Sequence, residues 1–467
     1  MTAYDEVPYA GRPYADAHPE RMATMAALHG IEAAPVGSSR TLEIACGDGA
    51  NLVPMAAELP GSTFFGFDLA AQPIEAGRRL AERAGLANVT LRQLDLADFP
   101  ADAGEYDYII AHGLYAWIPA PLRDRLLALI ARHLAPRGVA FVSYNVFPGC
   151  HVRRMVWEMM RFHIEPLEEP AQRIGEARAL ARLLAEGRTR DDPFSALLKA
   201  ELERFSSRDP GFLFHDDLAA INDPCWFHEF VAHADRHGLQ FLCEAELVAT
   251  SYFGLGEAAR KVLDQLDPVV REQYLDFAKC RRFRQTLLCR DGLAVDRSSG
   301  VGRIESFKLA SRARGIAGEP EAAAPPRSDE ATARALLDAI DAASPNAVSV
   351  EDLAARMPGV ERTRLRELCF AAAVAGAAQL HIDAPRLGRT LAGRPMTTSL
   401  ARIQAADATM VTTLRHTAVN LDDELARRIL ALLDGTRDAG AIASQLRQPR
   451  DIVDARLAHL GRLGLVA

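Results

Sequence analysis

The sequence has 467 residues, of which 49% are hydrophobic and 25% are charged. These values are ordinary for a globular protein, and the length predicts about three domains. The formal net charge of −8 argues against a protein whose main function is to bind the phosphate backbone of nucleic acids, so we expect no nucleic-acid partner.

The N-terminus and the cysteines indicate the compartment. Residues 1–11 are polar and acidic and lack the basic start and apolar stretch of a secretory signal. No apolar run approaches the ~20 residues that span a bilayer. The seven cysteines are scattered and form no CxxC pair, which favours reduced thiols over a disulfide framework. We therefore expect a cytoplasmic protein without membrane insertion.

The first third of the chain consists of an irregular N-terminal segment followed by a series of predicted strands and helices. Residues 1–40 are rich in Tyr, Pro and His, which indicates an irregular lid followed by a helix at about 19–30. Short apolar runs, each predicted to be a strand, follow at 41–45, 63–67, 89–94, 108–111 and 139–144. Helices are predicted between them at about 51–59, 71–84 and 121–134. Strands and helices alternating at this spacing predict an α/β fold with a parallel sheet.

The rest of the chain is richer in helix. Residues 151–205 show the 3.6-residue spacing of helices, residues 210–295 are mixed, and residues 313–331 have the composition of a linker. Beyond the linker, a weak repeat of about 45 residues reads helix–helix–helix–strand, with strands at 379–382 and 463–466. It predicts tandem winged-helix-like modules, and two unrelated helical segments are the alternative. The expected domains are 1–165, 166–312 and 332–467, with the linker between the last two.

The loop after the first predicted strand carries the sharpest motif, Glu43-Ile44-Ala45-Cys46-Gly47-Asp48-Gly49. Glycines at a strand-to-helix turn let the backbone approach a ligand that faces the helix N-terminus. The dinucleotide fingerprint GxGxxG fails here, because Leu52 stands where its last glycine is required. The loop fits acidic-x-G-x-G-x-G, with Ala45 in place of the first glycine. An acidic side chain at this place suits a cationic ligand, which points to the sulfonium and amino groups of S-adenosylmethionine.

Acidic residues follow at the ends of the next two strands. Asp68 comes 21 residues after Gly47, where a carboxylate can accept both ribose hydroxyls. Asp95 follows the third strand and can take the adenine amino group. The fourth strand leads into His112-Gly113-Leu114-Tyr115-Ala116-Trp117. All these ends lie at the carboxyl edge of a doubly wound sheet, where ligands bind. A ligand-free or flavodoxin-like sheet with coincidental acids is the alternative.

Residues 41–145 resemble the class I methyltransferases, and nearly the whole chain resembles bacterial methyltransferases that carry a methyltransferase regulatory domain. The marks of this narrower family are Tyr4-Asp5-Glu6-Val7-Pro8-Tyr9, His18-Pro19, His112-Gly113-Leu114-Tyr115-Ala116-Trp117, Ser143-Tyr144-Asn145-x-x-Pro148-Gly149, Phe214-His215-Asp216-Asp217-Leu218, Phe283-Arg284-Gln285-Thr286-Leu287 and Leu433-Asp434-Gly435-Thr436. The resemblance implies a Rossmann-like methyltransferase sheet, a helix-rich middle domain and a winged-helix-like C-terminal region. Some members are similar to the rickettsial-type enzymes that methylate lysines of outer-membrane proteins. At Ala45 the family has glycine, and we expect the replacement to have a small steric cost.

The expected site has a cofactor part and an acceptor part. The cofactor S-adenosyl-L-methionine is expected to contact Glu43, Ala45, Cys46, Gly47, Gly49, Asn51, Asp68, Leu69, Asp95, Leu96 and His112. The resemblance places Tyr144, Asn145, Tyr115, Trp117 and Tyr4 near the transferable methyl group. There, phenol oxygens and amide carbonyls could hold an amine while it loses its proton. For each aromatic residue, a buried packing role is the alternative.

The expected reaction is methylation of a lysine amine on a protein, such as an outer-membrane or surface protein. No Asn/Asp-Pro-Pro-aromatic run or Pro-Cys pair follows the fourth strand, which counts against the adenine-N6, glutamine-amide and cytosine-C5 types. A small molecule, glycan or natural-product intermediate is the alternative acceptor, and a non-catalytic cofactor-binding regulator is a third class. The sequence leaves open whether the chain forms a homodimer. His233 and His237 are four residues apart, but no convincing third ligand follows them, so we expect no metal.

Overall fold

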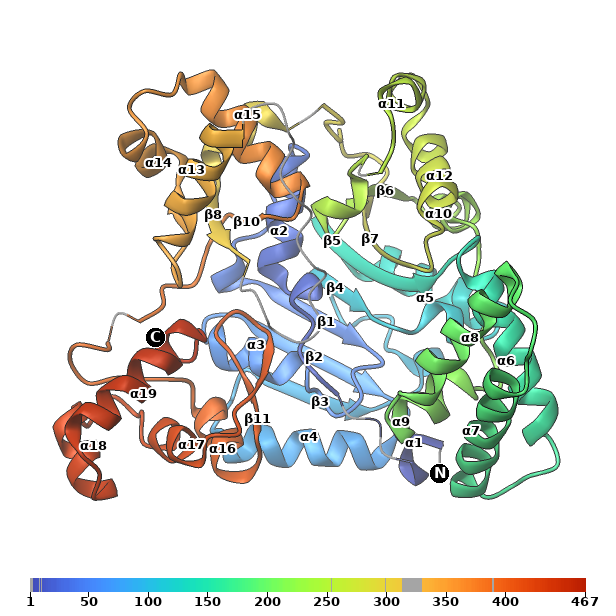
Figure 1. Cartoon of the computed structure of the whole chain (residues 1–467), viewed down its shortest axis with the longest axis horizontal. Coiled ribbons are helices and arrows are strands. Elements are labelled where there is room, and N and C mark those ends of the chain that lie inside the picture. Colours follow the sequence, from blue (N-terminus) through green and yellow to red (C-terminus); the bar gives the residue numbers. More distant parts are fainter. Residues whose placement is uncertain are drawn as a thin grey trace.

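The structure is a computed structural model of the chain (Figure 1). It describes residues 3–7, 9, 11–252, 254–298, 300–312, 330–388 and 390–467. The predicted linker 313–331 lies outside the described residues except for its last two, where helix α13 (Glu330–Asp341) begins. Pro8 of the N-terminal motif also lies outside them.

The described residues build a seven-stranded sheet at the centre of the molecule, in the order β3-β2-β1-β4-β5-β7-β6. The five predicted strands are present and parallel: β1 (Arg40–Ile44), β2 (Thr63–Asp68), β3 (Val89–Gln93), β4 (Tyr106–Ala111) and β5 (Leu134–Asn145). Two further strands, β6 (Leu239–Glu244) and β7 (Phe283–Arg290), complete it, and β7 is antiparallel to both of its neighbours. The sheet thus takes two strands from residues 166–312, the segment predicted as a separate middle domain.

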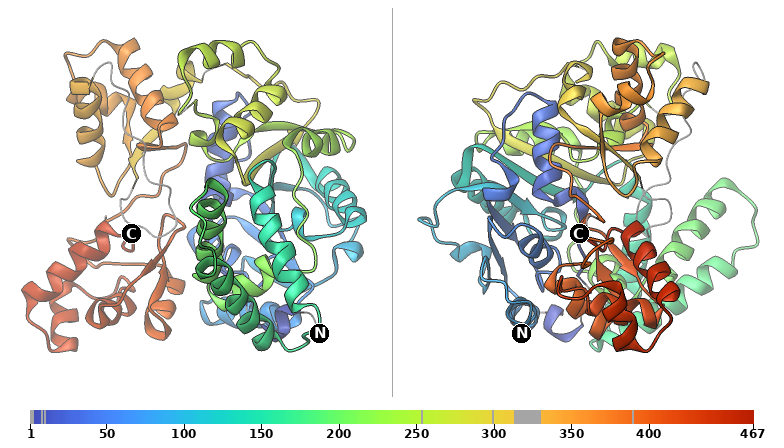
Figure 2. Two further views of the ribbon diagram at one scale, coloured as in Figure 1. Left: turned by 45° about the vertical axis from the view of Figure 1, so that its right-hand side comes forward. Right: turned by 90° about the vertical axis from the view of Figure 1, so that its left-hand side faces the viewer.

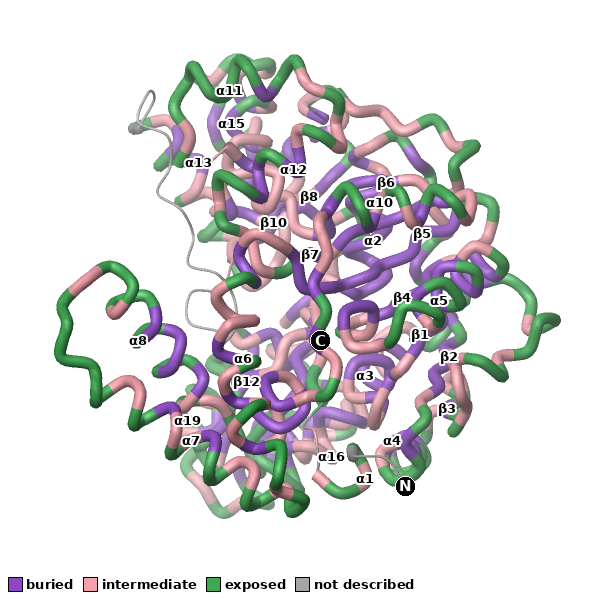
Figure 3. Tube along the Cα trace, turned by 90° about the vertical axis from the view of Figure 1, so that its right-hand side faces the viewer, coloured by how far each residue is buried: buried purple, intermediate pink, exposed green. Residues whose placement is uncertain are grey.

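Helices cover both faces of the sheet, because alternate residues of each strand point to opposite sides. On one face, Tyr108 and Phe141 pack with α2 (Pro19–Leu28), α3 (Leu52–Glu58) and α4 (Ala71–Arg83). On the other face, Ile109 and Val142 pack with α5 (Ala120–His133) and α10 (Phe227–Asp235). Figure 3 shows the strands as the most deeply buried part of the chain. The helices predicted near 19–30, 51–59, 71–84 and 121–134 are all confirmed.

A buried arginine joins β7 to the segment that follows β6. Arg284 is about 1% exposed and donates to Glu244 Oε1 at 2.6 Å, to Glu272 Oε2 at 3.1 Å and to Asp276 Oδ2 at 3.0 Å. A buried charge is tolerated only when it is paired in this way. The arginine of the 283–287 family mark is therefore a structural residue of the sheet edge.

Residues 150–217 form a helical lobe beside the carboxyl edge of the sheet, and the helical structure predicted for 151–205 is confirmed. Its helices are α6 (Cys150–Ile164), α7 (Pro170–Glu186) and α8 (Pro193–Ser206), which share an apolar core around Met160, Ala181 and Leu202. The short helix α9 (Pro210–Phe212) and a π-turn, Leu213–Asp217, lead back to the sheet. This half also contains α1 (Ala3–Glu6), the 3-10 turn η1 (Ala15–Ala17), α11 (Glu257–Leu263) and α12 (Pro268–Lys279).

The C-terminal region consists of two small units, which Figure 2 shows as separate orange and red lobes. The first unit contains α13, β9 (Val348–Ser349), α14 (Val350–Arg356), α15 (Arg362–Val374) and β10 (Ala378–His381). Its three-stranded sheet includes β8 (Lys308–Ser311), which precedes the predicted linker. The predicted helix–helix–helix–strand order is confirmed for this unit.

The second unit differs from its prediction at both ends. It contains α16 (Ser399–Asp407), a hairpin of β11 (Met410–Thr412) and β12 (Ala418–Asn420), and the predicted helices α17 (Glu424–Ala431), α18 (Ala439–Leu446) and α19 (Arg450–Arg462). The strand predicted at 463–466 is absent from the described chain, because this apolar tail instead closes the core of the unit. Across the described residues, each helix is too short or too polar to cross a membrane.

Candidate active site

A cavity of about 940 Å³ opens at the carboxyl edge of the parallel strands. The loops after β1, β2, β3 and β4 form its floor. The N-terminal segment, the helical lobe and the hairpin of the second C-terminal unit form its walls. A cavity of this size is typical of cofactor and substrate sites.

The loop after β1 bends through left-handed backbone conformations. The φ angles of Ala45, Gly47 and Gly49 are 58°, 55° and 71°. A Cβ atom on Gly47 would meet no atom of the described residues within 4 Å, whereas a Cβ on Gly49 would press on the side chains of Leu91 and Val53. Ala45, Cys46 and Gly47 line the cavity, as expected, and Gly49 does not. The cost at Ala45 is larger than expected, because a left-handed alanine is strained by roughly 1–2 kcal/mol.

Glu43, at the end of β1, is buried with one oxygen unpaired. Its Oε1 accepts a hydrogen bond from Asn51 Nδ2 at 2.7 Å, and its buried Oε2 has no hydrogen-bond partner among the residues that the structure describes. Burial raises the pKa of Glu43 to about 8. A cationic group in the cavity would stabilise the ionised carboxylate, so these residues fit the amino and sulfonium groups of S-adenosylmethionine.

Asp68 and Asp95 line the cavity at the ends of β2 and β3, together with Leu69 and Leu96. Asp68 also shapes the loop after β1: its Oδ2 accepts from the Gly47 amide at 2.9 Å and its Oδ1 from the Ala70 amide at 2.8 Å. Asp95 Oδ1 accepts from the amide of Ala97 at 2.7 Å. Both carboxylates are therefore fixed in place by the backbone and keep lone pairs for ribose and adenine groups.

His112, at the end of β4, forms one wall of the cavity. Its ring lies against Tyr14 with 3.8 Å between ring centroids, and its Nδ1 lies 3.1 Å from Ser143 Oγ. Burial lowers the pKa of His112 to about 3, so the imidazole is neutral. It offers a flat, uncharged surface rather than a base.

The five predicted acceptor residues divide into two groups. Tyr4, Trp117 and Asn145 line the cavity, whereas Tyr115 and Tyr144 do not. The Tyr144 hydroxyl lies 2.9 Å from Thr286 Oγ1, and the Tyr115 hydroxyl lies 2.8 Å from His233 Nδ1. The prediction that both tyrosines face the methyl group is corrected by this geometry, because their rings pack in the core on the α5–α10 face of the sheet. Neighbouring strand residues point to opposite faces, so Tyr144 and Asn145 cannot share one.

Several polar residues of the cavity wall were not predicted from the sequence. Asp16 and Glu246 share a hydrogen bond, and burial together with the neighbouring Glu246 raises the pKa of Asp16 well above its usual value. Asp216 also lines the cavity, and burial raises its pKa to about 6. Asp216 lay in the family mark 214–218, which could have identified it. His416, from the β11–β12 hairpin, had no comparable signal.

His233, on α10, and His237, just after the end of α10, form a polar contact outside the cavity. His233 Nε2 and His237 Nε2 lie 3.2 Å and 2.9 Å from the same oxygen of Asp124, on α5. Hydrogen bonds from the two rings lower the pKa of the Asp124 carboxyl. The cluster thus links the two helices on the face away from the cofactor loops.

Comparisons with known proteins agree with this architecture. Residues 41–138 match the family model "Methyltransferase domain", residues 209–290 match "Predicted methyltransferase regulatory domain", and residues 393–457 match "PKMT, C-terminal winged helix domain". Protein RP789 of Rickettsia prowazekii is 35% identical over 66% of this chain, which spans 56% of that relative. Protein RP028 of the same organism is 30% identical over 51% of this chain, and the aligned region covers 96% of RP028.

A solved structure extends the likeness to nearly the whole fold. PKMT2 from Rickettsia typhi in complex with AdoHcy matches with a TM-score of 0.84 at 24% identity, covering 98% of this chain and 100% of that one. A second structure of PKMT2 from Rickettsia typhi matches this chain with a TM-score of 0.85. The chain belongs to the class I S-adenosylmethionine-dependent methyltransferases that carry a methyltransferase regulatory domain.

Proposed function

We propose that this protein methylates lysine side-chain amines of a protein substrate. The observation that carries the proposal is the wall of the cavity beyond the cofactor acids, where aromatic rings and carboxyl groups stand together. Such a surface suits an aliphatic ammonium group, which is attracted by ring faces and by negative charge. The match to the family model "PKMT, C-terminal winged helix domain" and the likeness of fold to PKMT2 from Rickettsia typhi agree with the rickettsial-type lysine methyltransferases that the sequence resembles.

The aromatic part of this wall is held in place before any acceptor binds. Tyr4 stacks on His215 with 4.0 Å between ring centroids, and Tyr9 meets Phe212 edge to face at 4.7 Å. Trp117 lies under the guanidinium of Arg153, 5.8 Å from ring centroid to charge. Rigid rings can orient an alkyl-ammonium chain without first losing their own conformational freedom.

The amine must lose its proton and its water before it can attack. S-adenosylmethionine supplies an electrophilic methyl group, whereas a free lysine amine, with a pKa of ~10.4, is protonated at neutral pH. Burial raises the pKa of the Tyr9 phenol, so this hydroxyl can accept a hydrogen bond but is a poor base. Asp216, with its pKa raised to about 6, is mainly ionised at pH 7.5 and can accept the ammonium proton.

Asn145 is the other polar group suited to hold the acceptor. Its Nδ2 donates to Asn222 Oδ1 at 3.1 Å, which fixes the orientation of the amide. Its carbonyl oxygen can then accept a hydrogen bond from an amine N–H and so orient the neutral amine nitrogen for attack. We therefore assign Asn145, Trp117 and Tyr4 to the acceptor side and Asp216 to proton transfer.

The proposal is tested by transfer of an isotopically labelled methyl group. The full-length protein is incubated with labelled S-adenosylmethionine and a cell extract, and the protein and small-molecule fractions are separated. We expect label in protein, located on lysine ε-amines by peptide mass spectrometry. With the Asp68→Ala variant we expect roughly 10- to 100-fold less label when the S-adenosylmethionine concentration is below the wild-type Kd. Label confined to small molecules would contradict the proposal and favour the alternative acceptor class.

A further inference from the structure

The β11–β12 hairpin of the second C-terminal unit reaches the cofactor site. Its residues His416, Thr417 and Ala418 line the same cavity as Glu43 and Asp68. His416 is about 2% exposed and has a left-handed φ of 54°. Its amide donates to the Thr413 carbonyl at 3.0 Å, which closes the turn that presents the ring.

Hydrogen bonds of known direction link this histidine to Glu43. Asn51 Oδ1 accepts from the Tyr14 amide at 2.9 Å, and because a backbone N–H can only donate, the orientation of the Asn51 side chain is settled. His416 Nε2 lies 2.9 Å from the same oxygen and must therefore donate to it. Asn51 Nδ2 in turn donates to Glu43 Oε1 at 2.7 Å, and within the described part of the chain Oε2 of Glu43 has no partner.

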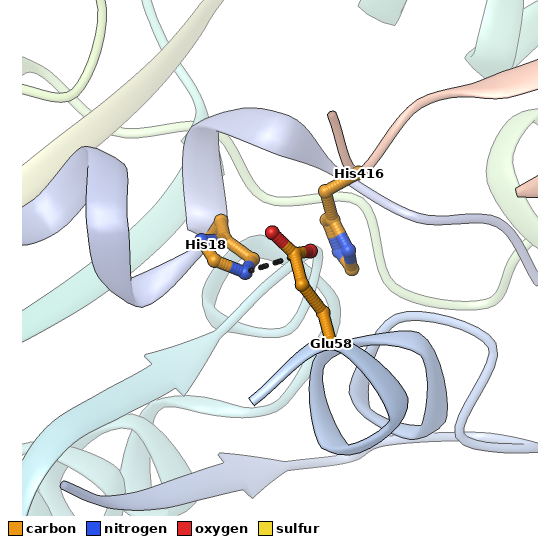
Figure 4. Close-up of side chains that lie close together, drawn as sticks. All are labelled: His18, Glu58 and His416. Carbon is orange, nitrogen blue, oxygen red and sulfur yellow. Dashed lines mark ion pairs between the residues drawn. The ribbon is translucent and has the colours of Figure 1, made fainter. Parts of the chain in front are cut away.

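The other side of the His416 ring lies near Glu58 and His18. With its proton on Nε2, His416 has a lone pair on Nδ1, a buried atom without a hydrogen-bond partner among the described residues. Figure 4 shows the Glu58 carboxyl group between the rings of His416 and His18. Burial raises the pKa of Glu58 to about 8, so this carboxyl is mainly protonated at neutral pH.

The same three residues have the composition of a metal site, since their ligand atoms lie within 4.8 Å of one another. The hydrogen bonds argue against that interpretation. His18 Nδ1 accepts from the Glu20 amide at 3.1 Å, at the start of α2, so the proton of a neutral His18 is on Nε2. That is the atom facing Glu58, 3.7 Å from Oε2, and a protonated nitrogen cannot bind a metal.

We propose that His416 is a positioning residue of the cofactor site, through which the C-terminal winged-helix unit holds Asn51 and thereby Glu43 ready for the cationic part of the cofactor. The second unit is attached to the same side of the molecule by other contacts as well. Ser399 Oγ donates to the Ala84 carbonyl at 2.7 Å, and Arg83 pairs with Asp407 at 2.7 Å. The cofactor site is therefore completed by residues from both ends of the chain. The inference rests on cofactor binding and holds for any methyl acceptor.

The test compares two replacements of His416 in the full-length protein. His416→Gln can place its amide nitrogen near the position of Nε2 and keep the bond to Asn51. His416→Asn tolerates the left-handed backbone but is too short to reach Asn51. By calorimetry with S-adenosylhomocysteine, we expect His416→Asn to raise the Kd by about 10-fold and His416→Gln by less than about 3-fold. Met410→Ala, an exposed position on the same hairpin, should leave the Kd unchanged.

A double-mutant cycle separates positioning from general destabilisation. If His416 acts through Asn51, His416→Asn should raise the Kd by no more than about 2-fold in an Asn51→Ala background. Equal losses in both backgrounds, or a His416→Asn variant that binds as tightly as the wild type, would overturn the inference. A wild-type protein that does not bind S-adenosylhomocysteine would overturn the cofactor assignment itself, which is a different result.

Discussion

Asp68→Ala should weaken cofactor binding and destabilise the cofactor loop at the same time. The carboxylate ends β2 at the cavity and accepts from the amides of Gly47 and Ala70. Removing it takes away the group expected to bind the ribose hydroxyls and leaves two backbone donors unpaired. The two effects have different readouts, so one variant tests both roles.

The magnitudes follow from the hydrogen bonds involved. Loss of charge-assisted bonds to the ribose is worth ~1.5–3 kcal/mol, or roughly 10- to 100-fold in Kd. Loss of an acceptor for the Gly47 and Ala70 amides should lower the free energy of unfolding by about 2 kcal/mol. Calorimetry with S-adenosylhomocysteine, well below the melting temperature, measures the first effect, and chemical denaturation of the unliganded protein measures the second.

Asp98→Ala is the matched control, because Asp98 lies on the same edge of the sheet but is exposed and outside the cavity. It should change neither quantity. A Kd for Asp68→Ala within twofold of the wild type would refute the ribose assignment. A lost affinity without any loss of stability would refute the loop-shaping role alone.

Three further predictions concern single groups. Because the pKa of Glu43 in the folded protein, about 8, lies above its ordinary value, the unliganded protein should lose stability as pH rises from about 5 to 8; thermal melts of Glu43→Gln should show a smaller decline, and parallel curves would contradict the burial argument. Tyr144→Phe should keep its rate per folded molecule and lose about 1 kcal/mol of stability, and a tenfold loss of turnover would show that Tyr144 reaches the acceptor. Arg284→Met should lower the free energy of unfolding, measured with denaturant, by about 3–5 kcal/mol, because it leaves buried carboxylates without their arginine partner. A variant of near-wild-type stability would contradict this.

The sequence predicted the parallel half of the sheet well, because each strand was a short apolar run bounded by amphipathic helices. It did not predict that β7 pairs with β5, since Phe283–Arg290 lies far along the chain and nothing local specifies the partner of a strand. The boundary placed at residue 165 therefore divided one sheet. The helices of both C-terminal units other than α16 were predicted from the sequence. The β11–β12 hairpin was not, because its strands of three residues each are too short for an alternation pattern.

The cofactor side of the site was more predictable than the acceptor side. The acids at strand ends were identifiable because a parallel sheet gathers the carboxyl ends of its strands at one edge. Tyr144 and Asn145 were assigned together, although adjacent strand residues cannot face the same side. His416 contacts Asn51 across 365 residues of sequence, and only the folded chain reveals that contact.

The most direct test of the account is a crystal structure of the full-length protein with S-adenosylhomocysteine. We expect the ribose hydroxyls at Asp68, the adenine at Asp95, the amino group near the unpaired oxygen of Glu43, and His416 still bonded to Asn51. A ligand bound outside this cavity, or a hairpin displaced from Asn51 in the complex, would contradict it.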